Sequence, residues 1–249
     1  MVVSLWSGPR NLSTALMYFF AHRGDFKVLD EPFFGAFLQR FNVWRPSREL
    51  ALAQMEKDPD KVMRQILDAG NHQNLFLKNM ANHLPLIEAS LEASKALNWK
   101  HIFLYRDPAA VIQSYKKQMQ NISLFDLAYK EQVEWLQKLQ KNKIDFYLLD
   151  SAKIQEKPSQ ELAALCQFLN IPFSTEMLNW PAGPIAEDGV WAKFWYHRVH
   201  QSTGIEAKPA NEQLSTEIKK EPLYLECLPY YQELQKVHYE QIQYARSAQ

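Results

Sequence analysis

The chain has 249 residues, of which 47% are hydrophobic and 13% aromatic, so a full core is available for one large α/β domain or two small ones. Lys and Arg total 28, as do Asp and Glu, which excludes a global field suited to nucleic acid or an anionic membrane. No apolar run of about 20 residues and no signal peptide is present, so we expect a cytoplasmic protein without a membrane span.

Residues 2–6 form a short apolar run that predicts a buried strand, and a helical pattern follows over 12–22. A tight turn at 7–9 joins them, so backbone N–H groups and a helix N-terminus meet at one point, as in anion sites. Arg10 adds a forked cation, and Ser13 and Thr14 add hydroxyl donors. The second Gly and the Lys-Ser/Thr pair of a Walker A loop are missing. The turn therefore predicts a site for a phosphate-bearing ligand that lacks the Walker A residues of an ATPase. The alternative is that it is an ordinary strand-to-helix turn.

Four further strand-like runs alternate with helical patterns, which predicts crossover units and a parallel sheet with helices on both faces. The strands are expected at 26–30, 75–78, 101–105 and 146–150, and the helices at 48–69, 85–97, 108–119, 124–140 and 159–169. We therefore predict an α/β three-layer sandwich with a central parallel sheet of about five strands. Ligands of such sheets bind beyond the carboxyl ends of the strands, where Glu31, Lys78 and Arg106 follow the second, third and fourth strands.

The last third of the chain has a different character. Residues 171–184 hold three prolines and predict irregular structure, and 189–204 combine aromatic with basic side chains. The second segment is interpreted as a lid or, alternatively, as a packed amphipathic helix, its relevant side chains being Trp191, Lys193, Trp195, Tyr196 and Arg198. From 211 on, a helical tail is expected, interrupted at Pro222 and Pro229. We predict one domain over 1–249, with a core at 1–170 and the lid segment and C-terminal helices at 171–249.

Two smaller features concern redox state and metals. Cys166 and Cys227 lie in apolar helical patterns and are expected to be buried thiols rather than a disulfide. His197 and His200 are three residues apart with no acidic or Cys partner near in sequence, so no metal site is predicted.

The segment HIFLYRDPAAVIQSYKKQ places Arg106 at the tip of a strand and Ser114 two turns into the following helix. An Arg and a hydroxyl presented in this way are placed to grip one phosphate from two directions. The alternative is that Arg106 pairs with a nearby acid and that Ser114 is an ordinary helix residue.

These residues resemble the sulfotransferases that use 3′-phosphoadenosine 5′-phosphosulfate (PAPS). Their first loop, P-[K/R]-x-G-[S/T]-[S/T], binds the 5′-phosphosulfate and is matched by residues 9–14, except that Leu12 replaces the glycine. Their second motif, a strand followed by Arg and a helical Ser eight residues later, binds the 3′-phosphate and is matched by Arg106 and Ser114. The resemblance covers about residues 1–169 and implies a P-loop, sulfotransferase-like fold. The cofactor-binding residues it implies are Ser7, Gly8, Pro9, Arg10, Asn11, Leu12, Ser13, Thr14, Arg106 and Ser114.

The resemblance also implies catalytic residues. A bacterial branch of the family carries Glu after the second strand, as Glu31 does, and in some members it is the general base. The cytosolic branch uses a His after the third strand, for which His83 is the counterpart, so either residue is open as the base. Arg10 and Lys78 are expected to stabilise the departing phosphate without a metal.

The resemblance implies sulfuryl transfer from PAPS, with the 3′,5′-bisphosphate (PAP) as product, to a hydroxyl or amine of a small-molecule acceptor. The acceptor and the oligomeric state remain open. One alternative function is a P-loop kinase of a small metabolite that uses ATP and Mg²⁺. Another is a degenerate nucleotide-binding module without turnover, which Leu12 supports.

Overall fold

The computed structural model describes residues 1–87, 98–207 and 214–247. Its centre is a five-stranded sheet in the order β2-β3-β1-β4-β5, in which every neighbouring pair is parallel. The strands are β1 Val2–Ser7, β2 Lys27–Asp30, β3 Leu75–Met80, β4 Trp99–Tyr105 and β5 Phe146–Asp150. The predicted parallel sheet of about five strands is confirmed.

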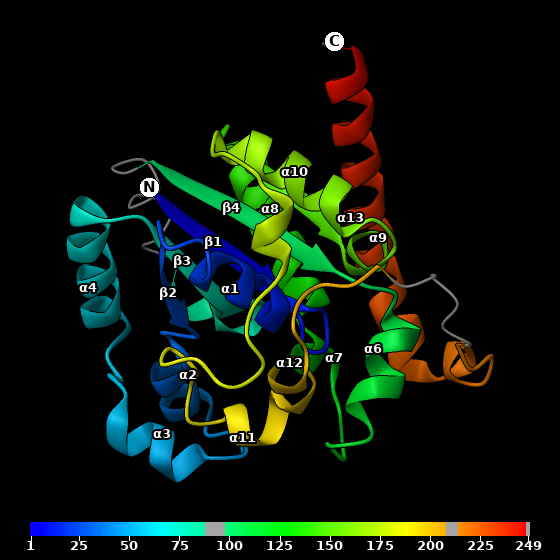
Figure 1. Ribbon diagram of the computed structural model, residues 1–249. Coiled ribbons are helices and arrows are strands. Elements are labelled where there is room, and N and C mark those ends of the chain that lie inside the picture. Colours follow the sequence, from blue (N-terminus) through cyan, green and yellow to red (C-terminus); the bar gives the residue numbers. More distant parts are fainter. Residues whose placement is uncertain (88–97, 208–213, 248–249) are drawn as a thin grey trace.

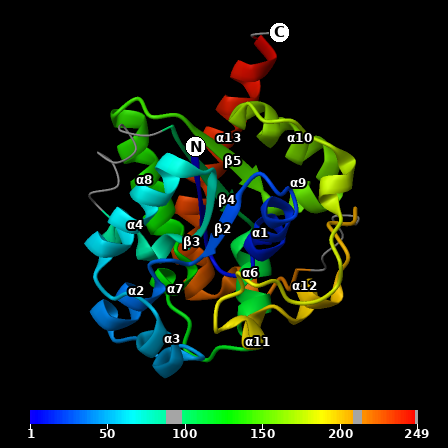
Figure 2. The ribbon, with the colours of Figure 1, turned by 60° about the vertical axis from the view of Figure 1, so that its left-hand side comes forward.

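Helices cover both faces of the sheet, which gives the three layers visible in Figures 1 and 2. One face packs against α1 (Ser13–Ala21), α9 (Ser151–Glu156) and α10 (Pro158–Leu169). The other packs against α4 (Pro59–His72), α8 (Tyr129–Lys141) and α13 (Pro222–Ser247). The remaining elements are α2 Phe34–Phe41, α3 Arg48–Gln54, η1 Ala81–Leu86, α6 Pro108–Tyr115, α7 Leu124–Leu127, η2 Thr175–Leu178, α11 Ala192–Trp195, α12 His197–Gln201 and η3 Ile218–Lys220.

The strand sequences divide the core into two halves. Successive side chains of a strand point to opposite faces, so Val3 and Leu5 of β1 join the core beneath α1, while Val2 and Trp6 join the core beneath α8. Both faces are buried, which explains why the strands are almost continuously apolar.

Two of the expected helices are broken in the structure, so those predictions were wrong in extent. The segment 48–69 divides into α3 and α4 because the Asp58 side chain accepts hydrogen bonds from the backbone N–H groups of Asp60 and Lys61 and so begins a new helix. The segment 124–140 divides at Ala128, whose φ of 60° ends α7 before α8 begins. In both segments the local start signal overrides a continuous apolar periodicity.

Two other expectations concern helix boundaries, and one helix was not expected at all. The tail is interrupted at Pro222 as expected, because η3 ends at Lys220 and Pro222 is the first residue of α13, but it is not interrupted at Pro229, which lies inside that helix. The helix α2 was not predicted. The expected helix at 85–97 lies mostly outside the described residues, and Pro85 itself is part of η1.

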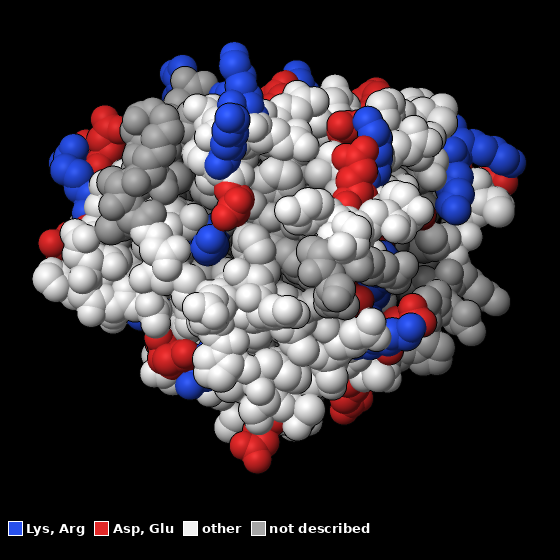
Figure 3. Space-filling view, turned by 90° about the horizontal axis from the view of Figure 1, so that it is seen from above, with Lys and Arg blue, Asp and Glu red and all other residues white. Residues whose placement is uncertain are grey.

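Both cysteines are buried and unbridged, as expected. No helix among the described residues combines the length and apolar character needed to cross a membrane. On the face shown in Figure 3, basic and acidic side chains are interspersed, in keeping with the equal totals of the two charge types.

Gly8 is required by close backbone packing. A Cβ atom at this position would lie 2.4 Å from the carbonyl oxygen of Leu127 in α7. We expect Gly8→Ala to lower the free energy of unfolding by about 1–3 kcal/mol, because a rigid backbone must move to accommodate the methyl group. Urea unfolding of the purified variant measures the loss, and an unchanged midpoint would contradict this account of Gly8.

Candidate active site

The loop that joins β1 to α1 is strained and firmly held. Arg10 and Leu12 have φ angles of 62° and 68°, in the left-handed region that costs most residues roughly 1–2 kcal/mol. The Asn11 side chain donates to the carbonyl of Leu104 (3.2 Å), and the Ser151 hydroxyl donates to the carbonyl of Asn11 (2.8 Å). Strain that the surroundings enforce in this way is typical of functional sites.

Leu12 adopts the backbone conformation that a glycine would adopt most easily. It is the N-cap of α1 and makes no side-chain cap hydrogen bond. The first turn of α1, residues 13–15, lines a cavity. Its backbone N–H groups have no acceptor within the helix, so they and the helix dipole favour an anion there. Leu12 therefore adopts a glycine-like backbone conformation although the sequence departs from the sulfotransferase motif at this position.

Arginine side chains surround the same point. The Arg10 Nε donates to the Ser114 hydroxyl oxygen (2.9 Å), and the Arg106 guanidinium donates to the Arg10 carbonyl (3.0 Å). Burial lowers the pKa of Arg10, and the positive charges of Arg198 and Arg106 lower it further. Like charges held this close are typical of a site that binds a multiply charged anion.

A cavity of about 320 Å³ lies beyond the carboxyl ends of β1, β2 and β3, at the end of the sheet where α6, α7, α11 and α12 gather in Figure 1. Most of the predicted site residues line it: Pro9, Arg10, Asn11, Leu12, Ser13, Thr14, Glu31, Lys78, His83, Arg106 and Ser114. Ser7 and Gly8 do not line it. The Ser7 hydroxyl donates to the Gly8 carbonyl (2.7 Å), so these two residues shape the turn from beneath.

Lys78 lies at the centre of a buried polar network. Its Nζ donates to Asp30 Oδ1 (2.8 Å), Glu31 Oε1 (2.8 Å) and the Tyr196 hydroxyl (2.6 Å). Burial alone would lower the pKa of Lys78, but the two carboxylates raise it well above its usual value. An ammonium has three N–H donors, so contact with a departing phosphate would require Lys78 to exchange one of these partners.

Glu31 follows β2 directly, and its backbone N–H donates to the Lys78 carbonyl (2.8 Å). Its φ of 48° is a strained value for a side chain with a Cβ atom. Burial raises the pKa of Glu31, the Lys78 charge offsets part of this rise, and Asp30 adds to it. A carboxyl group with a raised pKa beside a cavity suits general-base chemistry.

His83 lies in η1 and packs near the rings of Phe34 and Phe37, at centroid distances of 6.0 and 4.6 Å. Burial lowers the pKa of His83 to about 3, with help from the charges of Lys78 and Arg45. The ring is neutral near pH 7, and so low a pKa makes it a weak proton acceptor.

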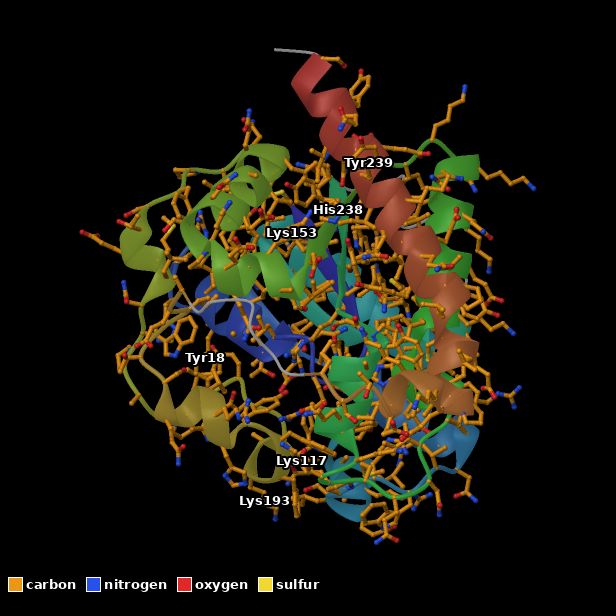
Figure 4. The ribbon with its side chains drawn as sticks, turned by 90° about the vertical axis from the view of Figure 1, so that its right-hand side faces the viewer. Tyr18, Lys117, Lys153, Lys193, His238 and Tyr239 are labelled. Carbon is orange, nitrogen blue, oxygen red and sulfur yellow. The ribbon has the colours of Figure 1, made fainter. Side chains whose placement is uncertain are left out.

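The lid segment, residues 189–204, is two short helices, α11 and α12, rather than one amphipathic helix. Trp191, Trp195, Tyr196 and Arg198 line the cavity. Lys193 is exposed and points outward in Figure 4, away from the molecule.

Residue 188, just before the lid segment, ties it to the body of the protein. The Asp188 carboxylate accepts a hydrogen bond from the Tyr18 hydroxyl of α1 (2.9 Å). The same carboxylate lies 2.8 Å from Nε2 of His200 in α12. Sequence spacing alone did not reveal this acidic partner of His200.

Sequence reasoning missed three charged residues of the site. Asp30 is opposite Lys78 in the β2–β3 register, a relation that appears only once the strands are paired. Arg45 and Asp126 form an ion pair and both line the cavity, although 81 positions separate them. The only cue in the sequence to any of these three residues was that Asp30 directly precedes the predicted site residue Glu31.

The model of the family described as "Sulfotransferase domain" matches residues 1–237. The chain therefore belongs to the sulfotransferase domain family.

Two relatives from Arabidopsis thaliana, the branched-chain-amino-acid aminotransferase-like proteins 2 and 1, are each 36% identical to it, over 92% and 82% of this chain. The matched regions are 40% and 36% of those proteins, so the chain spans less than half the length of these relatives.

Two solved structures share the fold. The sulfotransferase domain from the curacin biosynthetic pathway is 18% identical, with a TM-score of 0.54 over 94% of this chain and 96% of that one. The sulfotransferase domain from the Synechococcus PCC 7002 olefin synthase is 16% identical, with a TM-score of 0.52 over 93% of each chain. The predicted sulfotransferase-like α/β fold is thereby confirmed.

Proposed function

We propose that this protein transfers a sulfuryl group from PAPS to a hydroxyl or amine of a small-molecule acceptor. The observation that carries the proposal is one cavity in which an arginine-rich anion site faces a buried carboxylate with a raised pKa. The first part suits a nucleotide with several phosphate groups, and the second suits removal of a proton from an acceptor.

Each part of the site has a role in this reaction. The first turn of α1 and Arg10 hold the 5′-phosphosulfate, and Arg106 and Ser114 hold the 3′-phosphate. Glu31 takes the acceptor proton while the acceptor oxygen or nitrogen bonds to sulfur and the bond from sulfur to the phosphate oxygen breaks. Arg10 and the backbone N–H groups of the first turn of α1 stabilise the negative charge that develops on the departing phosphate.

Lys78 contributes indirectly in this proposal. Because its Nζ contacts both carboxylates and the Tyr196 hydroxyl, it holds Glu31 in place at the cavity wall. The aromatic side chains of the lid segment exclude water from the transferring group.

The test is turnover with labelled PAPS against a panel of phenols, alcohols, amines and sugars, with ATP as the comparison donor. Label that moves to an acceptor supports the proposal. Transfer from ATP in place of PAPS would favour a kinase. Tight binding of PAP with no transfer to any acceptor class would favour a binding module.

Turnover is expected to survive chelation. Arg10, Arg106 and Arg198 supply the positive charge that a divalent metal supplies in many phosphoryl transferases. We expect the same rate with EDTA and with added Mg²⁺, measured as transfer of labelled sulfate. Activity that disappears with chelator and returns with Mg²⁺ would contradict the metal-independent mechanism.

A further inference from the structure

The ammonium of Lys78 is shared by two carboxylates. Its distances to Asp30 Oδ1 and to Glu31 Oε1 are equal, at 2.8 Å, and all three side chains are buried. The three groups carry one positive and two negative charges, so Lys78 cannot fully neutralise both acids. Among the described residues, Lys78 is the only cation that contacts Glu31 directly, and Asp30 competes for it.

Asp30 is the better supported of the two acids. Its Oδ2 also accepts hydrogen bonds from the Gly189 backbone N–H (2.9 Å) and from the Tyr196 hydroxyl (2.8 Å). Tyr196 in turn accepts from Trp191 Nε1 (3.0 Å). Three donors from the lid segment and β3 thus fix Asp30 in a position where it shares the Lys78 ammonium with Glu31.

We propose that Asp30 is a positioning residue for Glu31: by competing for Lys78, it keeps Glu31 available as a proton acceptor instead of a permanent ion-pair partner. Because Asp30 also contacts Gly189 and Tyr196, its competition for Lys78 depends on the position of the lid segment. The inference rests on the role proposed above for Glu31.

Several other titratable groups surround Glu31. Lys78 of β3 and Arg45, which lies between α2 and α3, stabilise the charged form of Glu31. The neutral hydroxyls of Tyr196 and of Tyr115 in α6, and the neutral His83 ring of η1, complete the surroundings. The acids nearby are Asp30, whose negative charge raises the pKa of Glu31, and Asp126 of α7, which is paired with Arg45.

The test is an NMR titration of Glu31 in the full chain containing isotope-labelled glutamate, with the signal assigned by its loss in Glu31→Gln. In the unsubstituted protein we expect a midpoint above 4.5, the usual value for glutamate. Asp30→Asn is expected to lower that midpoint by about one pH unit, because Glu31 is then the only carboxylate that contacts Lys78 among the described residues. An unchanged midpoint in folded Asp30→Asn would overturn the proposal.

Asp188→Asn is the matched control, because Asp188 also anchors the lid segment but contacts Tyr18 and His200 instead of Lys78. It should leave the Glu31 midpoint unchanged, and an equal fall there would assign the effect to lid seating and sink the proposal. If Asp30→Asn does not fold, Asp30→Ser decides. It removes the same negative charge with a smaller side chain and should also lower the Glu31 midpoint, whereas no change or a rise would count against the idea.

This titration needs neither PAPS nor an acceptor, so its outcome is independent of whether sulfuryl transfer is observed. Once an acceptor is known, the acidic limb of the pH–rate profile should move in the same direction in Asp30→Asn.

Discussion

Replacing Glu31 with Gln should lower kcat by about 100-fold or more and leave the affinity for PAP unchanged. The amide keeps the size of the side chain but cannot take the proton from the hydroxyl or amine of the substrate. In the unsubstituted enzyme, kcat/KM should fall as the pH drops through the raised pKa of Glu31, because the protonated carboxyl is not a base. Steady-state kinetics across the acidic range measure both effects, and the acidic limb should be absent in Glu31→Gln.

His83→Asn provides the comparison for this assignment. Its effect on kcat should be smaller, since burial lowers the pKa of His83 to about 3 and leaves a neutral ring that packs against Phe37. A nearly silent Glu31→Gln with an inactive His83→Asn would move the base to His83 and align this chain with the cytosolic branch. If neither substitution alters kcat, the proton leaves by another route.

The strands and the β1–α1 loop could be predicted from the sequence because their signals are local. Each strand is a short apolar run, and a parallel sheet brings the ends of such runs to one edge whatever their order. The helix breaks at Asp58 and Ala128 could not be found in the same way. At these two positions a capping contact or a left-handed residue outweighs the apolar periodicity around it.

The site was predictable to the extent that it consists of residues at strand ends. Arg10, Glu31, Lys78 and Arg106 all line the cavity as expected. The partners of Lys78 were not predictable. Tyr196 is 118 positions away, and neither strand sequence shows which residue of β2 pairs with Lys78 in β3. Sequence patterns thus locate the edge of a site, while the hydrogen bonds that set its protonation depend on tertiary packing.

We expect this protein to prefer adenosine 3′,5′-bisphosphate over ADP, and Arg106→Ala should remove that preference. Losing a charge-assisted contact to a phosphate costs about 1.5–3 kcal/mol, which corresponds to roughly 10- to 100-fold in affinity. Calorimetric titration of both nucleotides measures the change. The unsubstituted protein should bind the bisphosphate much more tightly, and equal affinity for ADP would contradict the assignment of the 3′-phosphate site.

Comparing the affinities for the two nucleotides distinguishes two effects of Arg106→Ala: loss of a phosphate contact and loss of the contact with the Arg10 carbonyl. The Arg106 guanidinium donates to the Arg10 carbonyl, so the substitution also removes a contact that holds the β1–α1 loop. ADP lacks the 3′-phosphate but still uses that loop, so an equal loss for both nucleotides would identify loop damage. A loss confined to the bisphosphate identifies direct recognition of the 3′-phosphate. Lys193→Ala is the control, because this basic residue of the lid segment is exposed, lies outside the cavity and should change neither affinity.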